Sequence, residues 1–195
     1  MAAVSDIGRY LVETIASLYL IIVVLRGVLQ ASGADFYNPI SQFIARATNP
    51  PLQVMRKVLP AGRRFDASIV LLALLVQAIG LSAVLMLSGF MPPSVLAVAI
   101  WSAIGVAALL VNSYLVALII MIVLSWVAPG SRHPAVVLVH QITHPIMAPV
   151  RSLLPNMGGL DFSPILLFIV INVIQIALRH LAVATGLPPS LVMGL

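Results

Sequence analysis

Four long apolar runs dominate the chain, separated by short stretches that are rich in polar residues and proline. A helix needs on the order of 20 residues to cross a hydrocarbon core about 30 Å thick, and every run is long enough. The pattern therefore predicts four transmembrane helices, over Ile7 or Leu11 to Gln30, Ile69 to Leu87, Ser94 to Val127 and Pro164 to Ala184.

The third run, residues 94–127, has 34 residues, which is too many for one crossing and too few for two crossings with a turn. We predict one long helix of about 51 Å, at a rise of about 1.5 Å per residue. Its start, around Trp101, is expected to lie tilted at or outside the membrane interface. A break near Gly105 or Asn112 is the alternative.

Two short helices are predicted between the first two spans. The first, Ile40–Ala47, follows the helix-start signal Asn38-Pro39. Its apolar residues share one face: Ile40, Phe43, Ile44 and Ala47. We expect this amphipathic helix to lie on the membrane surface, with packing against the protein as the alternative.

Proline should divide this connection. Pro50-Pro51 is predicted to end the first short helix, because proline lacks an amide donor and restricts the residue before it. A second short helix is expected over Leu52–Leu59, closed by Pro60, and Ser68 is predicted to cap the span that follows.

One stretch of this connection occurs twice. Residues 48–68 and 143–163 align at a constant offset of 95 without a gap, and seven of the 21 positions are identical. The identities are Thr48/Thr143, Pro50/Pro145, Arg56/Arg151, Leu59/Leu154, Pro60/Pro155, Asp66/Asp161 and Ser68/Ser163. Because helix breakers and charges match rather than common apolar residues, the chain is predicted to be a duplication, with residues 1–93 as the first repeat and 94–195 as the second.

The composition supports a membrane protein. Hydrophobic residues make up 62% of the chain and charged residues 8%, against about 25% charged in soluble domains. The absence of cysteine excludes disulfides and thiol chemistry. The N-terminal segment MAAVSDIGRY lacks the basic region of a signal peptide, so the first apolar run is expected to be a retained span.

Charge predicts the orientation. Each repeat holds an even number of spans, so both copies should face the same way, related by an axis along the membrane normal. The first loop, Ser32 to Ala67, carries five basic and two acidic residues, whereas the turn over residues 88–93 carries no charge. The positive-inside rule then places both loops in the cytoplasm and both termini outside.

The repeated Arg and Asp residues are candidate contact residues. Arg56 and Asp66 are ten residues apart, as are Arg151 and Asp161. This spacing suits an ion pair that folds each loop back on itself. In a second interpretation the arginines bind lipid phosphates while the aspartates help to cap the next spans, and a site for a partner protein or an anion remains a third.

Several polar residues fall inside the predicted spans: Arg26, Gln77, Asn112, Asn172 and Gln175. Arg26 is close enough to a span end to snorkel to the headgroups, although an intramembrane charge is also a functional candidate. Gln77 and Asn172 are equivalent in the two copies and lie near the midplane. They are expected to bond across the bundle, joined by the other two amides, or alternatively to line a polar path.

Catalytic chemistry is not expected. His140 and His144 have the i, i+4 spacing of a metal pair with His133 nearby, but the absence of a neighbouring carboxylate favours interfacial histidines. No nucleotide-binding, nucleophile-elbow or zinc-protease motif is present. We therefore expect a non-enzymatic protein without a cofactor.

The segments DFYNPISQF and HPIMAPVRSLLPNMGGLDFSP, within a pattern of NP, TxP, R, LP and DxS that occurs twice, resemble the YggT family of small bacterial inner-membrane proteins. The first copy departs from this pattern, with AGRRFDAS where the second has NMGGLDFS. The resemblance implies a multi-pass inner-membrane protein connected with osmotic tolerance and potassium uptake. In plastid relatives it implies haem-protein maturation and organelle division, and it transfers no catalytic residue.

Taken together, these features predict an all-α integral membrane protein that acts as a scaffold or assembly factor in osmotic stress or envelope homeostasis, through its cytoplasmic loops. A subunit of a small ion channel or transporter for potassium or osmotic uptake is the alternative. The expected partners are anionic lipid headgroups, a partner membrane protein and further copies of the chain, and not nucleic acid.

Overall fold

The computed structural model describes residues 2–59, 62, 64–154 and 161–187. This part of the chain forms helices and no strands. The helices are α1 (Ala2–Ala31), α2 (Pro39–Met55), α3 (Ala67–Leu87), α4 (Val95–Val127), α5 (Pro134–Leu153) and α6 (Ser163–Ala184). Helices α1, α3, α4 and α6 are long and apolar enough to cross a membrane. The chain is thus a multi-pass membrane protein with the predicted helical fold.

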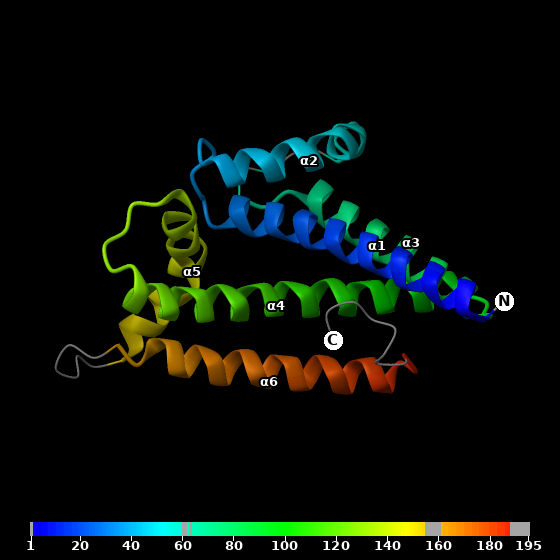
Figure 1. The fold of residues 1–195 in the computed structure, drawn as a ribbon. Helices are drawn as coiled ribbons and strands as arrows, with labels where there is room; N and C mark the ends of the chain where they lie inside the picture. Colours follow the sequence, from blue (N-terminus) through cyan, green and yellow to red (C-terminus); the bar gives the residue numbers. More distant parts are fainter. Residues whose placement is uncertain (1, 60–61, 63, 155–160, 188–195) are drawn as a thin grey trace.

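The two halves repeat one arrangement of span, short helix and span. Pro39 and Pro134, at the offset of 95, begin α2 and α5. Figure 1 shows α2 and α5 toward the end of the bundle at which α1 and α4 finish, with the N-terminus at the opposite end. The fold prediction of two tandem parallel repeats is confirmed.

Helix ends follow local sequence signals. Gly33, Gly89 and Gly186 have positive φ angles of 64°, 81° and 74°, a conformation that glycine adopts without strain. After each glycine, the next amide donates back to a carbonyl of the last turn, as in Ala34 N to Leu29 O at 3.0 Å. These bonds satisfy carbonyls that would otherwise lack partners at the ends of α1, α3 and α6.

The long helix α4 is continuous over its 33 residues, so the predicted single helix is confirmed and neither suggested break occurs. Ser94 caps it, accepting a hydrogen bond from Ala97 N at 3.1 Å. Helix α4 packs against α3, α5 and α6 and more lightly against α1, while α1 packs mainly against α3. It is therefore the helix that connects the two repeats.

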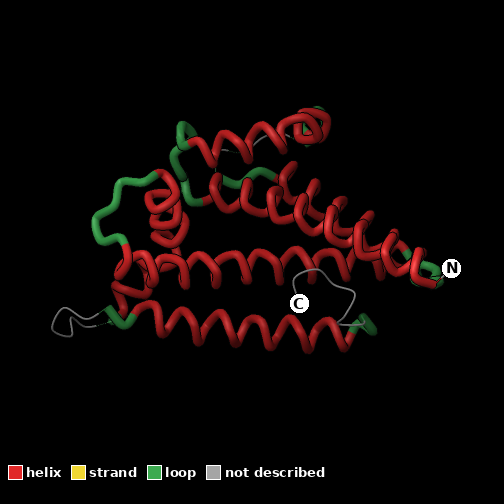
Figure 2. The backbone as a smooth tube through the Cα atoms, in the orientation of Figure 1, coloured by secondary structure: helices red, strands yellow, loops and turns green. Residues whose placement is uncertain are grey.

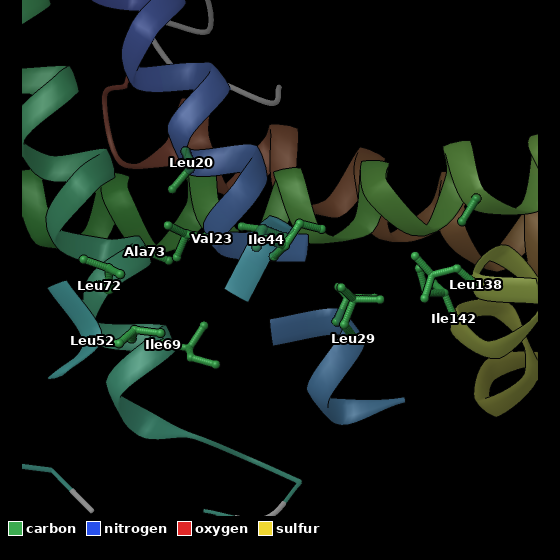
Figure 3. Close-up of a cluster of buried hydrophobic side chains, with 13 residues drawn as sticks. Leu20, Val23, Leu29, Ile44, Leu52, Ile69, Leu72, Ala73, Leu138 and Ile142 are labelled. Atoms are coloured by element: carbon green, nitrogen blue, oxygen red, sulfur yellow. The ribbon is translucent and has the colours of Figure 1, made fainter. Parts of the chain in front are cut away.

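The largest core cluster lies where α1, α2 and α3 meet. Leu20 and Val23 of α1 pack with Leu72 of α3 and with Ile44 and Leu52 of α2 (Figure 3). Contact between apolar helices in lipid depends on close van der Waals packing. Helix α2 is therefore held against the spans as part of the core.

The predicted end of the first short helix at Pro50-Pro51 is wrong. Helix α2 runs through both prolines to Met55, so the separate helix over Leu52–Leu59 does not form. Figure 2 shows the later turns of α2 end-on where the earlier turns run across the page, as expected for a helix that bends at proline.

The structure explains how the prolines are tolerated. Pro51 lacks the amide that would bond to Ala47 O, and the Tyr19 hydroxyl of α1 donates to that carbonyl at 3.4 Å. Thr48 Oγ1 donates to Ile44 O at 2.8 Å, a bond inside the helix that often accompanies bending. A neighbouring span therefore replaces part of what proline removes.

The predicted apolar face of α2 is only partly buried against the protein. Ile44 is buried, but Phe43 is exposed and small polar residues lie on the buried face. The buried residues are Ser41, Ile44, Ala45, Thr48 and Leu52. The small side chains of Ser41, Ala45 and Thr48 allow α2 to approach α1 and α3 closely, so the alternative of packing on protein applies to this buried face.

Candidate functional site

The first Arg–Asp pair joins a partly exposed arginine to a fully buried carboxylate, which also caps a helix. Arg56 Nη2 lies 2.7 Å from Asp66 Oδ2, and the side chains are 29% and 0% exposed. The other carboxylate oxygen, Asp66 Oδ1, accepts a hydrogen bond from Ser68 N at 3.0 Å. Asp66 is thus the N-cap of α3, which corrects the prediction that Ser68 caps it; the Ser68 hydroxyl instead donates to Leu59 O at 2.9 Å.

The second pair repeats this geometry at the surface. Arg151 Nε and Nη2 lie 2.9 Å and 2.8 Å from Asp161 Oδ2, and Asp161 Oδ1 accepts from Ser163 N at 3.0 Å. Partial burial would raise the pKa of Asp161, but hydrogen bonds from Ser163 and Arg151 outweigh that effect and lower it below its ordinary value. Helix α6 begins at Ser163, so this serine, like Ser68 in the first copy, lies inside the first turn of its helix.

The predicted pairing is therefore present in both copies, together with a capping bond to the residue two positions after each Asp. What the pairs contact outside the chain, lipid or partner protein, stays a prediction. The two pairs differ in environment, because the side chains of the second are 50% and 41% exposed.

Arg26 adds a second cation to the first copy. It lies within electrostatic range of Arg56 and Asp66. Its Nε atom is buried and has no hydrogen-bond partner among the described residues, and the same holds for Arg56 Nε. The equivalent position in the second copy is Met121, whose sulfur accepts a hydrogen bond from the Thr143 hydroxyl at 3.3 Å. The duplicated loops have therefore diverged, and the first copy alone holds this group of charges.

The intramembrane amides do not form the predicted cluster. Gln175 Nε2 donates to Asn112 Oδ1 at 2.6 Å, joining α6 to α4. Gln77 is fully buried, and both of its side-chain polar atoms lack a partner among the described residues. Asn172 lies on the exposed side of α6 and donates to Phe168 O at 2.8 Å. The predicted bond between Gln77 and Asn172 is absent, because the two equivalent positions have opposite environments.

Two hydrogen bonds join the segment that leads into α2 to helix α5 of the other repeat. Asn38 Nδ2 donates to Pro134 O at 2.7 Å, and Asp35 N donates to Gln141 Oε1 at 3.0 Å. Sequence reasoning identified Asn38 only as a helix cap, a role it also has, and missed Gln141. Asparagine at the start of α2 was the available signal, because its amide nitrogen is free to bond elsewhere when its oxygen caps the helix.

The surface next to these bonds is aromatic. Phe36, Tyr37 and Phe43 are exposed, and Arg46 is exposed on α2 beside them. Aromatic residues and arginine are enriched both in protein interfaces and at the membrane interface. We call Phe36, Tyr37, Phe43 and Arg46 the loop-end surface.

Of the three histidines on or next to α5, one caps the helix and two are exposed. His133 caps α5, with Nδ1 accepting from Ala135 N at 3.3 Å, and His140 and His144 are exposed. The described residues contain no group of three or more His, Asp or Glu side chains suited to hold a metal ion.

Comparison with known proteins assigns the chain to a family. Protein PA0392 of Pseudomonas aeruginosa is 44% identical over 98% of both chains. Protein YggT of Escherichia coli K12 is 35% identical over 95% of this chain and 97% of its own length, and a protein of Haemophilus influenzae is 30% identical over 82% and 84%. The names of all three describe them as uncharacterised, so the likeness transfers no activity.

No solved structure matches the chain. The model of the CCB3/YggT family matches two segments, residues 6–87 and 100–182, which correspond to the two repeats. The chain therefore belongs to the CCB3/YggT family.

Proposed function

We propose that this protein is a non-enzymatic scaffold of the bacterial inner membrane that holds a partner membrane protein through the loop-end surface, on the cytoplasmic side, and that it acts in osmotic or envelope homeostasis. The observation that supports this proposal is the joining of the segment before α2 to α5 of the other repeat, by the Asn38 and Gln141 hydrogen bonds. A surface fixed in this way loses little conformational entropy when a partner binds.

The residue types on the loop-end surface favour a protein partner that binds next to the lipid headgroups. Tyr37 is 83% exposed and Phe43 lies on the outer side of α2, and such rigid aromatic side chains commonly dominate binding energy. The net positive charge of the first loop adds attraction to anionic headgroups.

Photo-crosslinking tests this proposal. A photoreactive residue at Tyr37 should give one stoichiometric adduct in intact cells, and the same protein should be lost from the purified complex after Tyr37→Ala. The matched control is a photoreactive residue at Ile79, which is also exposed but lies within the α3 span. Identical adducts from both positions, or co-purification that is unaffected by Tyr37→Ala, would refute docking at the loop-end surface.

An ion-channel or transporter subunit is the second candidate. The observation that favours it is Gln77, a buried intramembrane amide without a partner among the described residues, since polar groups inside the membrane often mark transport paths. Protein reconstituted in liposomes should then conduct potassium, and Gln77→Leu should abolish the flux. The absence of flux in the wild type, or flux that Gln77→Leu leaves unchanged, would exclude this role for Gln77.

A further inference from the structure

The two repeats contact each other mainly through α3 and α4, and the equivalent contact between α6 and α1 is missing from the described helices. Helix α3 of the first repeat packs on both α1 and α4. Its counterpart α6 packs on α4 and α5, and no comparable packing of α6 on α1 occurs among the described helices. A closed two-fold arrangement would contain both contacts. One face of α6 and one face of α1 therefore lack the kind of neighbour that the junction between the repeats provides.

Burial at equivalent positions identifies the face of α6. Leu81 and Leu85 of α3 are buried in a cluster with Trp101 and Ile104 of α4. Their counterparts at the offset of 95 are Ile176, which is 48% exposed, and His180, which is also exposed. The same contrast separates buried Gln77 from exposed Asn172.

The exposed amide adds a separate argument. Asn172 is nine residues from the start of α6, about 14 Å along the helix at 1.5 Å per residue, and so lies near the middle of the span. A carboxamide that faces lipid at this depth is unfavourable, and such groups normally face another helix.

The corresponding face of α1 is charged. The counterparts of Trp101 and Ile104 are Asp6 and Arg9, and the counterpart of Ala108 is Glu13. On α6, the counterpart of buried Val84 is Arg179, next to His180. None of these five charged or titratable residues belongs to an ion pair within the described part of the chain.

The two faces carry complementary charge. Two carboxylates and one guanidinium on α1 oppose one guanidinium and one histidine on α6. Figure 1 shows the start of α1 and the end of α6 at the same end of the bundle, so in neighbouring molecules with a common orientation these groups lie at the same depth. Contact between these faces of neighbouring molecules would therefore pair opposite charges where α3 and α4 pair apolar side chains.

We infer that the protein associates with itself head to tail, with the Asn172, Ile176 and Arg179 face of α6 packing on the Asp6, Arg9 and Glu13 face of α1 in a second copy. The contact reuses the geometry of α3 on α4. It is heterologous, so it generates a ring or an open row in the membrane plane. It lies away from the loop-end surface and does not depend on the partner proposed there.

Cysteine crosslinking tests this contact directly, because the chain contains no cysteine. Co-expressed Arg9→Cys and Ile176→Cys chains should form a mixed disulfide dimer after mild oxidation, and neither variant alone should do so. The matched control is Ile174→Cys, an exposed residue on the other side of α6, which should not crosslink to Arg9→Cys. Dimers from Ile176→Cys alone would show a symmetric contact between two α6 helices, and the absence of the mixed dimer would also overturn the inference.

Charge reversal gives a second test. Arg179→Asp and Asp6→Arg should each shift the particle from oligomer to monomer in native mass spectrometry, because like charges then meet at every junction. Mixing the two variants should restore the oligomer, since the two reversed side chains meet at one junction and the two unchanged side chains meet at the next. Rescue by mixing also shows that both chains are folded, whereas oligomers that are unaffected by either reversal would refute the contact.

Discussion

At the residue scale, the environment of the two Arg–Asp pairs matters more than their shared sequence. Each pair combines an ion pair with a capping bond. The Asp66 carboxylate is buried and lies near two arginines, Arg56 and Arg26. The Asp161 carboxylate is partly exposed and pairs with Arg151. Solvent screens an exposed pair strongly, so the two copies contribute very different free energies to the fold.

Replacing each aspartate by asparagine separates these contributions, because asparagine can still cap a helix. Asp66→Asn should lower the free energy of unfolding by about 1–3 kcal/mol, since it leaves two partly buried arginines without their carboxylate. Asp161→Asn should lower it by less than about 1 kcal/mol. Unfolding of both variants in the same detergent measures the difference, and equal losses would contradict the assigned environments.

The pairing was predictable from the ten-residue spacing, but burial was not. Sequence spacing fixes which residues can reach one another within a loop, whereas burial depends on how α1 packs beside that loop. The same reason explains the failure at Gln77 and Asn172, which are equivalent in sequence but differ in which helices surround them.

At the element scale, α2 shows why local rules failed at Pro50 and Pro51. Proline reliably removes an amide donor, and this favoured a break. The free energy lost with that hydrogen bond is smaller when another group donates to the carbonyl that proline leaves unpaired. Here the donor to Ala47 O is the hydroxyl of Tyr19, which is far away in the sequence. Helix starts at Pro39 and Pro134, by contrast, depend on residues next to one another and were predictable.

A double-mutant cycle tests the role of Tyr19. Tyr19→Phe should destabilise the wild type by about 0.5–1.5 kcal/mol, the typical contribution of one hydrogen bond. In a Pro51→Ala background the same change should cost close to nothing, because the alanine amide can bond to Ala47 O. The coupling free energy from denaturation of the four proteins measures the effect, and a coupling of zero would show that the tyrosine does not compensate for the proline.

At the scale of the whole molecule, the even number of spans per repeat accounts for the placement of both short helices at one end. The spacing of apolar residues, the lengths of the apolar runs and the duplication are all visible in the sequence, so the overall fold was predictable. Its orientation in the membrane is a separate question, decided by loop charge during insertion, and it stays a prediction.

Single cysteines at equivalent positions test that orientation. Lys57→Cys and Ser152→Cys are both exposed and lie at the offset of 95. In intact cells both should be protected from an impermeant thiol reagent, while Phe90→Cys, in the turn between α3 and α4, should react. Labelling of only one of the two loop positions would contradict a shared side, and protection of Phe90→Cys with labelling of both loops would reverse the assigned orientation.

The closeness of Arg26 to Asp66 has a consequence for how the chain is made. Arg26 and Asp66 are separated by 40 residues, so during synthesis the first apolar segment leaves the ribosome long before the carboxylate that lies near it in the folded protein. An isolated span with an unneutralised arginine partitions poorly into lipid. We therefore expect the first two spans to enter the bilayer together as one helical hairpin, after α3 has been synthesised. The second repeat has methionine at the equivalent position, so α4 is free to partition by itself.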